Sequence, residues 1–289
     1  MANLKEVRTR IASVSSTQQI TSAMKMVSAA KFRRAQLAIL GMRPYAAQLN
    51  EIISSINVSD GVTTPYHEVR KPRKVLMLVI TSNKGLCGAF NANVIKQATA
   101  QIEHHKKEGR ELSMITLGKK ATEHFSKQEG LVIEQYDELL DNATFDNVYE
   151  LSEKLMSDFC HHRYDLIEVV YNQYKNSITQ ILSTEQFLPL IPGKVPSSQD
   201  ERNSDFIFEP SKSQILYDLV PFLLHTQFYR IILDSLASEH GARMSAMQSA
   251  TDNATALLKE LKLTYNKARQ AAITNEIIEI VSGSEALKG

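Results

Sequence analysis

Tryptophan is absent from this chain of 289 residues, which also holds only 11 glycines and two cysteines. The low glycine content is typical of a helix-rich protein rather than a loop-rich one. Because Cys87 and Cys160 stand in unrelated contexts, we expect no disulfide framework and infer a reducing compartment. The longest apolar run, Val75–Ile80, is far shorter than the roughly 20 residues of a membrane-spanning helix. These absences favour a soluble protein that meets a membrane only through partners.

The chain also lacks an excess of either charge, because 33 Lys and Arg stand against 32 Asp and Glu. The net charge of +1 therefore calls for neither nucleic acid nor anionic lipid as a partner. Residues 1–34, however, contain seven basic side chains and one acid, a local charge of +6. Such a basic segment can bind DNA phosphates or the acidic surface of another protein, and both interpretations stay open here.

A long amphipathic helix is predicted at the N-terminus, from about residue 3 to residue 55. Good helix formers dominate this segment, and Gly41 and Pro44 predict a kink or a break near its end. The apolar residues recur at helical spacing, at Leu4, Val7, Ile11 and Val14 and then at Ile20, Met24 and Val27.

The C-terminal segment carries a heptad pattern. Its apolar or small residues are separated alternately by three and by four positions. Four heptads of this kind predict a coiled coil within a helix of about 60 residues, roughly 90 Å long. Because a helix of this length needs a partner, and the first helix is the matching one, we predict that the two termini pair antiparallel. The positions are Met244, Met247, Thr251, Ala254, Leu258, Leu261, Tyr265, Ala268 and Ala272.

Strands and helices alternate between the two terminal helices, which predicts a mostly parallel α/β sheet. The fold class is therefore α/β plus a long antiparallel coiled coil, with domains at 1–58, 73–205 and 210–289. Expected strands lie at 74–81, 112–117, 131–136 and 166–174, with an antiparallel edge strand at 178–188, and expected helices at 91–109, 119–128 and 145–162.

Three groups of residues have features of a chemical site. Ser82–Gly88 follows the first strand, where α/β folds bind phosphates, but it lacks the third glycine of the dinucleotide fingerprint. We therefore expect a tight turn there. The pairs His104–His105 and His161–His162 lack the further ligands of a metal site, and Cys87 is expected to be a small buried residue rather than a nucleophile.

Several segments in order along the chain share their sequence with one known family. Ile273–Gly283 (ITNEIIEIVSG) follows that family's C-terminal signature, with Ser284 where an alanine is usual. On these segments the chain resembles the γ subunit of F-type ATP synthase. The others are Ala250–Asn253 and Tyr265–Ala271 in the last helix, Arg10–Val14 and Ala23–Val27 in the first, and Lys84–Gly88 in the middle.

The resemblance implies a rotating shaft with no active site and no cofactor of its own. In this family the paired termini stand inside a ring of three α and three β subunits, and the α/β domain meets the ε subunit and the c ring. It also implies a peripheral position at the cytoplasmic face of the bacterial inner membrane and no nucleic-acid partner.

Eleven positions match residues that face partners in the family. For one of them, Arg269, the alternative to a partner contact is that it is an ordinary exposed charge on a coiled coil. The expected β-subunit contacts are Met24, Lys25, Arg33, Arg34, Arg243, Arg269, Gln270 and Thr274, and the expected foot against the c ring and ε is Phe208, Glu209 and Pro210.

Two other functions compete with the shaft. The first is a nucleotide-binding α/β enzyme with helical appendages, and the second is a DNA-binding coiled coil.

Overall fold

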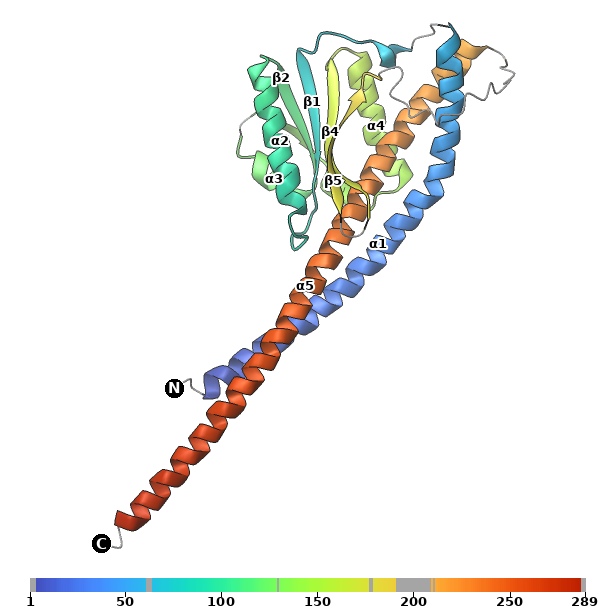
Figure 1. Ribbon diagram of the computed structural model, residues 1–289. Helices are drawn as coiled ribbons and strands as arrows, with labels where there is room; N and C mark the ends of the chain where they lie inside the picture. The colour runs from blue at the N-terminus through green and yellow to red at the C-terminus, as the bar shows by residue number, and fades with distance from the viewer. Residues whose placement is uncertain are drawn as a thin grey trace. The chain divides into compact units, whose positions relative to one another are not determined.

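The computed structural model describes residues 4–60, 64–128, 130–176, 179–190, 209 and 211–286 (Figure 1). Their contacts divide the chain into two compact units, Met1–Ser28 with Met244–Gly289 and Ala29–Arg243, and each unit is described by itself. The helices are α1 (Leu4–Asp60), α2 (Phe90–Lys107), α3 (Lys119–Phe125), α4 (Phe145–Cys160) and α5 (Lys212–Ala286), with short 3-10 turns at Pro65–His67 and Glu138–Leu140. The strands are β1 (Lys74–Ile80), β2 (Glu111–Leu117), β3 (Val132–Gln135), β4 (Leu166–Tyr174) and β5 (Gln180–Leu188).

The larger unit is built on a five-stranded sheet with the order β3-β2-β1-β4-β5. β1 is parallel to both of its neighbours, β2 is parallel to β3, and β5 is antiparallel to β4. Six of the seven residues of β1 are fully buried, as expected for a central strand covered on both faces. The predicted mostly parallel sheet with an antiparallel edge strand is confirmed.

Helices cover both faces of this sheet. On one face α2 and α3 pack over side chains such as Met77 and Met114. On the other face α4 and α5 pack over the larger part of the core, which includes Leu78 and Phe228 and to which α1 contributes Leu49. Every predicted strand of the sheet and every predicted helix that covers it is present. The ends of these elements differ from the predicted ends by a few residues at most.

The predicted break of the first helix near Gly41 and Pro44 does not occur, whereas the predicted kink there stays a prediction. α1 continues through Pro44 to Asp60. A proline inside a helix removes one backbone hydrogen bond at a cost of about 3 kcal/mol. Packing on both sides offsets this cost, because Ile39 and Leu49 are each only 4% exposed. The last helix likewise begins earlier than its heptad pattern indicates, at Lys212, and contains Pro221.

In the smaller unit, α1 and α5 pair through a seam that is partly polar. Thr251 Oγ1 donates to Thr21 Oγ1 at 2.9 Å, and Gln18 Nε2 donates to Thr255 Oγ1 at 2.7 Å. These contacts confirm that the two termini pair. They also fix an antiparallel register in which Leu4 lies opposite about residue 268. The apolar seam residues of this unit are Val7, Met247, Ala254, Leu258 and Leu261, all less than 10% exposed.

The predicted seam is therefore too long by one position. Ala272 is exposed, and it lies beyond the position opposite Leu4, the first described residue of α1. No helix among the described residues is long and apolar enough to cross a membrane.

Gly118 tests the close approach between the residues that follow β1 and those that follow β2. Its φ is 102°, and a Cβ added to it would lie 2.3 Å from the carbonyl oxygen of Thr81. We expect Gly118→Ala to lower the free energy of unfolding by roughly 3–5 kcal/mol, measured by urea denaturation. Gly130→Ala is the matched control. Gly130 also has a positive φ, of 75°, but a Cβ added to it would meet no atom within 4 Å. The control is expected to lose about 1–2 kcal/mol. Equal losses for the two variants would contradict the close approach.

Candidate partner-binding surfaces

The end of α5 is exposed and apolar. All described side chains from residue 269 to residue 284 are exposed, and in the register with α1 they lie beyond the described residues of that helix. Ile273, Ile277 and Ile280 are 49%, 55% and 67% exposed. Exposed apolar patches of this kind are typical of surfaces that bind another molecule. We call residues 269–284 the α5 tip.

Three of the sequence-predicted contact residues lie on the α5 tip. Arg269, Gln270 and Thr274 are exposed, and Thr274 Oγ1 donates to the backbone carbonyl of Gln270 at 2.9 Å. The structure therefore leaves their side chains accessible to a partner. Whether they grip a β subunit stays a prediction.

The basic residues predicted on α1 are also accessible, but not all to the same degree. Arg33 and Arg34 are exposed, and Met24 and Lys25 are half-buried. Among the described side chains, no acid forms an ion pair with Lys25, Arg33 or Arg34. A contact between these cations and an acidic partner stays a prediction.

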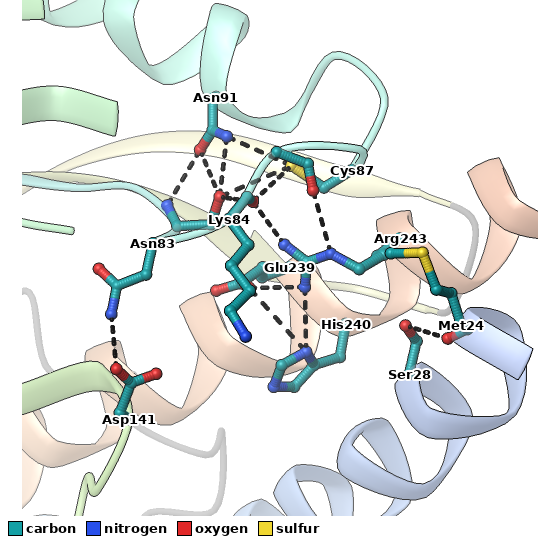
Figure 2. Close-up of polar contacts among 12 residues, drawn as sticks. Met24, Ser28, Asn83, Lys84, Cys87, Asn91, Asp141, Glu239, His240 and Arg243 are labelled. Atoms are coloured by element: carbon teal, nitrogen blue, oxygen red, sulfur yellow. Dashed lines mark hydrogen bonds and ion pairs between the residues drawn. The ribbon is translucent and has the colours of Figure 1, made fainter. Parts of the chain in front are cut away.

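Arg243 behaves differently from the other predicted contacts, because it binds within its own chain (Figure 2). It is 7% exposed, and its guanidinium donates to Lys84 O at 2.7 Å, to Gly85 O at 3.3 Å and to the Glu239 carboxylate at 2.6 Å. Arg243 therefore joins the loop after β1 to α5. The expected contact between Arg243 and a β subunit has no support in this geometry.

Burial shifts the pKa values of two ionisable residues beside Arg243, Glu239 and His240. Burial raises the pKa of Glu239, while the positive charges of Arg243 and Lys31 oppose that rise. Burial, with the same two cations, lowers the pKa of His240 to about 4. His240 is therefore neutral at pH 7, and its Nδ1 lies 3.4 Å from Arg243 Nη1, where it can accept a hydrogen bond.

The loop at Ser82–Gly88 is a structural turn rather than a phosphate site. It presents the carbonyl oxygens of Lys84 and Gly85 to Arg243, whereas a phosphate loop presents backbone N–H groups. Asn91 closes the turn, because its Oδ1 accepts from Ser82 N at 3.0 Å and its Nδ2 donates to Ser82 Oγ at 2.8 Å (Figure 2). The geometry thus gives no support to the nucleotide-binding enzyme.

The remaining candidates for chemistry also have structural roles. Cys87 is 2% exposed, and its sulfur accepts a hydrogen bond from Asn91 Nδ2 at 3.3 Å. His105 is buried, with its Nε2 3.0 Å from a carboxylate oxygen of Glu168. Within the described part of the chain, no group of three or more His, Cys, Asp or Glu could hold a metal ion.

The predicted foot falls mostly outside the described residues. Phe208 and Pro210 lie outside them, and Glu209 is exposed. The foot therefore stays a prediction.

Sequence reasoning missed Glu239 and a cluster of aromatic side chains on α1, α4 and α5. The spacing of Glu239 and Arg243, four residues apart on one helix, was a readable signal for their ion pair. The aromatic residues gave no such signal, because they lie far apart in the sequence and meet only where three helices pack.

Comparison with known proteins gives a consistent result over the full length. The family model described as ATP synthase matches residues 3–287. The chain is 54% identical to the ATP synthase gamma chain of Flavobacterium psychrophilum and 53% identical to that of Flavobacterium johnsoniae, and each match covers all of both chains. A gamma chain from Geobacter metallireducens is 41% identical, again over the whole of both chains.

Solved structures share the fold. A chain of the Euglena gracilis mitochondrial ATP synthase, in an assembly of OSCP, F1 and the c ring, superposes with a TM-score of 0.69. That match is 22% identical and covers 98% of this chain and 94% of the other. A chain from the rotor of the same enzyme gives a TM-score of 0.64 at 21% identity, covering 93% and 98%.

The buried ion pair of Arg243 can be tested by removing one partner. Arg243→Met leaves the Glu239 carboxylate and two loop carbonyls buried without their donors, so we expect a loss of about 3–5 kcal/mol of unfolding free energy by urea denaturation. The matched control is Arg163→Met, because Arg163 pairs with Asp158 but has a side chain that is 69% exposed. That variant should lose less than about 1 kcal/mol. If Arg243→Met lost equally little unfolding free energy, the ion pair of Arg243 and Glu239 would not hold the loop after β1 in place.

Proposed function

This chain belongs to the ATP synthase family as a gamma chain, and on that premise we propose that it is the central rotating shaft of an F1Fo ATP synthase. The shaft transmits torque between the proton-driven c ring and the catalytic ring of three α and three β subunits. Nucleotides bind and react on those subunits, so the chain itself is a non-catalytic part of the complex. No cofactor is assigned to it.

The α5 tip is the structural observation that supports this function best. Its isoleucine side chains are about half exposed in the isolated chain, which leaves apolar area in water that an enclosing apolar sleeve would cover. A single helix, free of its partner, is also the narrowest element that can turn inside such a sleeve. The tip thus fits the bore of a ring of subunits.

The charged contacts of the shaft are proposed on α1 and on the α5 tip. Lys25, Arg33 and Arg34 offer positive charge to an acidic segment of a β subunit. Arg269, Gln270 and Thr274 offer hydrogen-bond donors at the tip. Residues 208–210 are proposed to meet the c ring and the ε subunit.

The location follows from these partners. As a peripheral F1 subunit, the chain is held at a membrane through the complex. We place it at the cytoplasmic face of the bacterial plasma membrane, as expected for a relative of bacterial gamma chains.

Co-expression with the α and β subunits of the same organism tests the shaft and the role of its tip. We expect the tagged chain to retain both subunits and to support ATP hydrolysis. The variant Ile277→Lys/Ile280→Lys should reduce assembled, active complex about tenfold or more, because two charges would enter an apolar bore. Ile277→Val/Ile280→Val keeps the tip apolar and serves as the control. If the wild-type chain retains neither α nor β, the proposed function is wrong.

The basic residues of α1 are tested by torque in single-molecule rotation. Arg33→Glu/Arg34→Glu should lower the torque at low salt, where charges are least screened, and the difference from wild type should shrink as salt rises. Lys96→Glu/Lys107→Glu makes the same charge change on exposed side chains of α2 and should leave torque unchanged. Unchanged torque for the α1 variant at low salt would rule out this electrostatic contact.

A further inference from the structure

His225 of α5 is buried against α4 and has a polar side chain of that helix at each ring nitrogen. Its Nδ1 lies 2.5 Å from Ser152 Oγ, and its Nε2 lies 3.2 Å from a carboxylate oxygen of Glu153. Tyr149, one turn earlier on α4, stacks on the imidazole with the two ring centroids 4.0 Å apart. This single side chain therefore joins α4 to α5 through both of its nitrogens and one face of its ring.

The neutral imidazole depends on the Ser152 hydroxyl as a donor. An ionised carboxylate only accepts hydrogen bonds, so the neutral ring carries its one N–H on Nε2, toward Glu153. Nδ1 is then an acceptor, and the Ser152 hydroxyl donates to it. The same hydroxyl lies 2.9 Å from the backbone carbonyl oxygen of Tyr149, but its single hydrogen serves one acceptor at a time. In the neutral state this hydrogen bond runs from α4 to α5.

The same atoms can also hold a protonated ring. With a second proton, Nδ1 donates to Ser152 Oγ, and the hydroxyl turns its own hydrogen to the carbonyl oxygen of Tyr149. The Glu153 carboxylate and the face of the Tyr149 ring both attract the positive charge. The added proton comes from solvent, to which the Glu153 side chain is 57% exposed, and no other group is lost. The site therefore accepts a proton while the two helices stay in contact.

Burial opposes this protonation. It lowers the pKa of His225, and the Glu153 charge counteracts that change only in part. The folded protein therefore binds the proton less readily than the unfolded chain does. The stability contributed by the neutral ring is complete above the ordinary pKa of 6.5, and it is lost as the pH falls toward the lower pKa of the folded state.

The other titratable side chains around this contact bring no further charge to it at pH 7. Tyr66, in the 3-10 turn before β1, and Cys160 of α4 both interact with Glu153. Burial raises the pKa of Tyr66 to about 12 and also raises the pKa of Cys160, so both are neutral. On α5, burial raises the pKa of Tyr229, one turn after His225. Among the described residues, Glu153 is thus the charged side chain that acts on His225.

These contacts have a regulatory consequence. We propose that His225 is a pH-sensitive latch between α4 and α5, which accepts the hydrogen bond of Ser152 when neutral and, in acid, takes up a proton and weakens the contact between the two helices. The latch depends on the position of Ser152 Oγ, which lies within hydrogen-bonding distance of two acceptors. It makes this part of the fold sensitive to pH between about 7 and 5, where histidine titrates. The inference is independent of the proposed function.

NMR of the full chain with carbon-13 in its histidine rings tests the contacts of the latch. The His225 resonance is identified by its absence in His225→Asn, or by its change in Ser152→Ala if the first variant does not fold. We expect this resonance to titrate with a pKa below 6.5. Glu153→Gln should lower that pKa further, because the carboxylate favours the charged ring. Ser152→Ala should lower it as well, because a hydrogen bond from a charged donor is stronger than one from a neutral donor.

Glu150→Gln is the matched control, because it removes the same charge from an exposed position of α4. It should change the pKa of His225 less than Glu153→Gln does. Equal changes in the two variants, or a His225 pKa above 6.5 in the wild type, would overturn the latch and leave the proposed function intact.

Urea denaturation at about pH 7 and pH 5 tests the weakening of the helix contact. On acidification, the unfolding equilibrium constant of the wild type should rise about threefold or more beyond that of His225→Asn. Asparagine can still accept the hydrogen bond of Ser152, but it takes up no proton. His124→Asn removes an exposed histidine instead and should follow the wild type. The same pH dependence in His225→Asn as in the wild type would show that His225 is not the latch.

Discussion

The register of α1 against α5 is the constraint on which the rest of the molecule depends. In the smaller unit, Thr21 lies against Thr251 and Gln18 against Thr255. In the larger unit, Ala35 and Ile39 pack with Leu233 and Ala237. Apolar seams made of alanine tolerate sliding, whereas a hydrogen-bonded polar pair is satisfied in one register only. Polar residues in a coiled-coil seam fix register in this way at some cost in stability.

This register decides which parts of α5 are left for other molecules. The described part of α1 starts at Leu4, so the α5 tip extends past the described residues of that helix. The same two helices also bring Tyr45 of α1 against Phe222 of α5, where α4 adds Phe145. One helix pair thus leaves an exposed helix tip at one end and forms part of an aromatic cluster further along.

The buried pair of Glu239 and Arg243 has a complementary role, because it connects the sheet to α5. Arg243 donates to two carbonyl oxygens of the loop after β1, and Glu239 balances its charge from one turn away. A buried ion pair is weak evidence for stability by itself, but removing one partner leaves the other charge uncompensated. The arrangement therefore favours one position of the loop after β1 relative to this part of α5.

The sequence by itself determined the elements that follow from local periodicity. Alternation of apolar runs with amphipathic helices predicts the parallel sheet, and the heptad spacing after Met244 predicts the pairing of the termini. Local rules did not decide whether the helix breaks at Pro44, where buried Ile39 and Leu49 hold it together, and they failed at Ala272, which has the spacing of a seam but is exposed.

Only the tertiary structure decided which polar and aromatic side chains meet. The sequence around Arg243 does not indicate whether its side chain faces solvent or binds a loop 158 residues earlier in the chain. Tyr45, Tyr149 and Phe222 belong to three helices, and their exposure depends on how those helices cross. Periodicity records the face of each helix that is buried, whereas contacts between distant segments depend on packing, which the one-dimensional pattern does not contain.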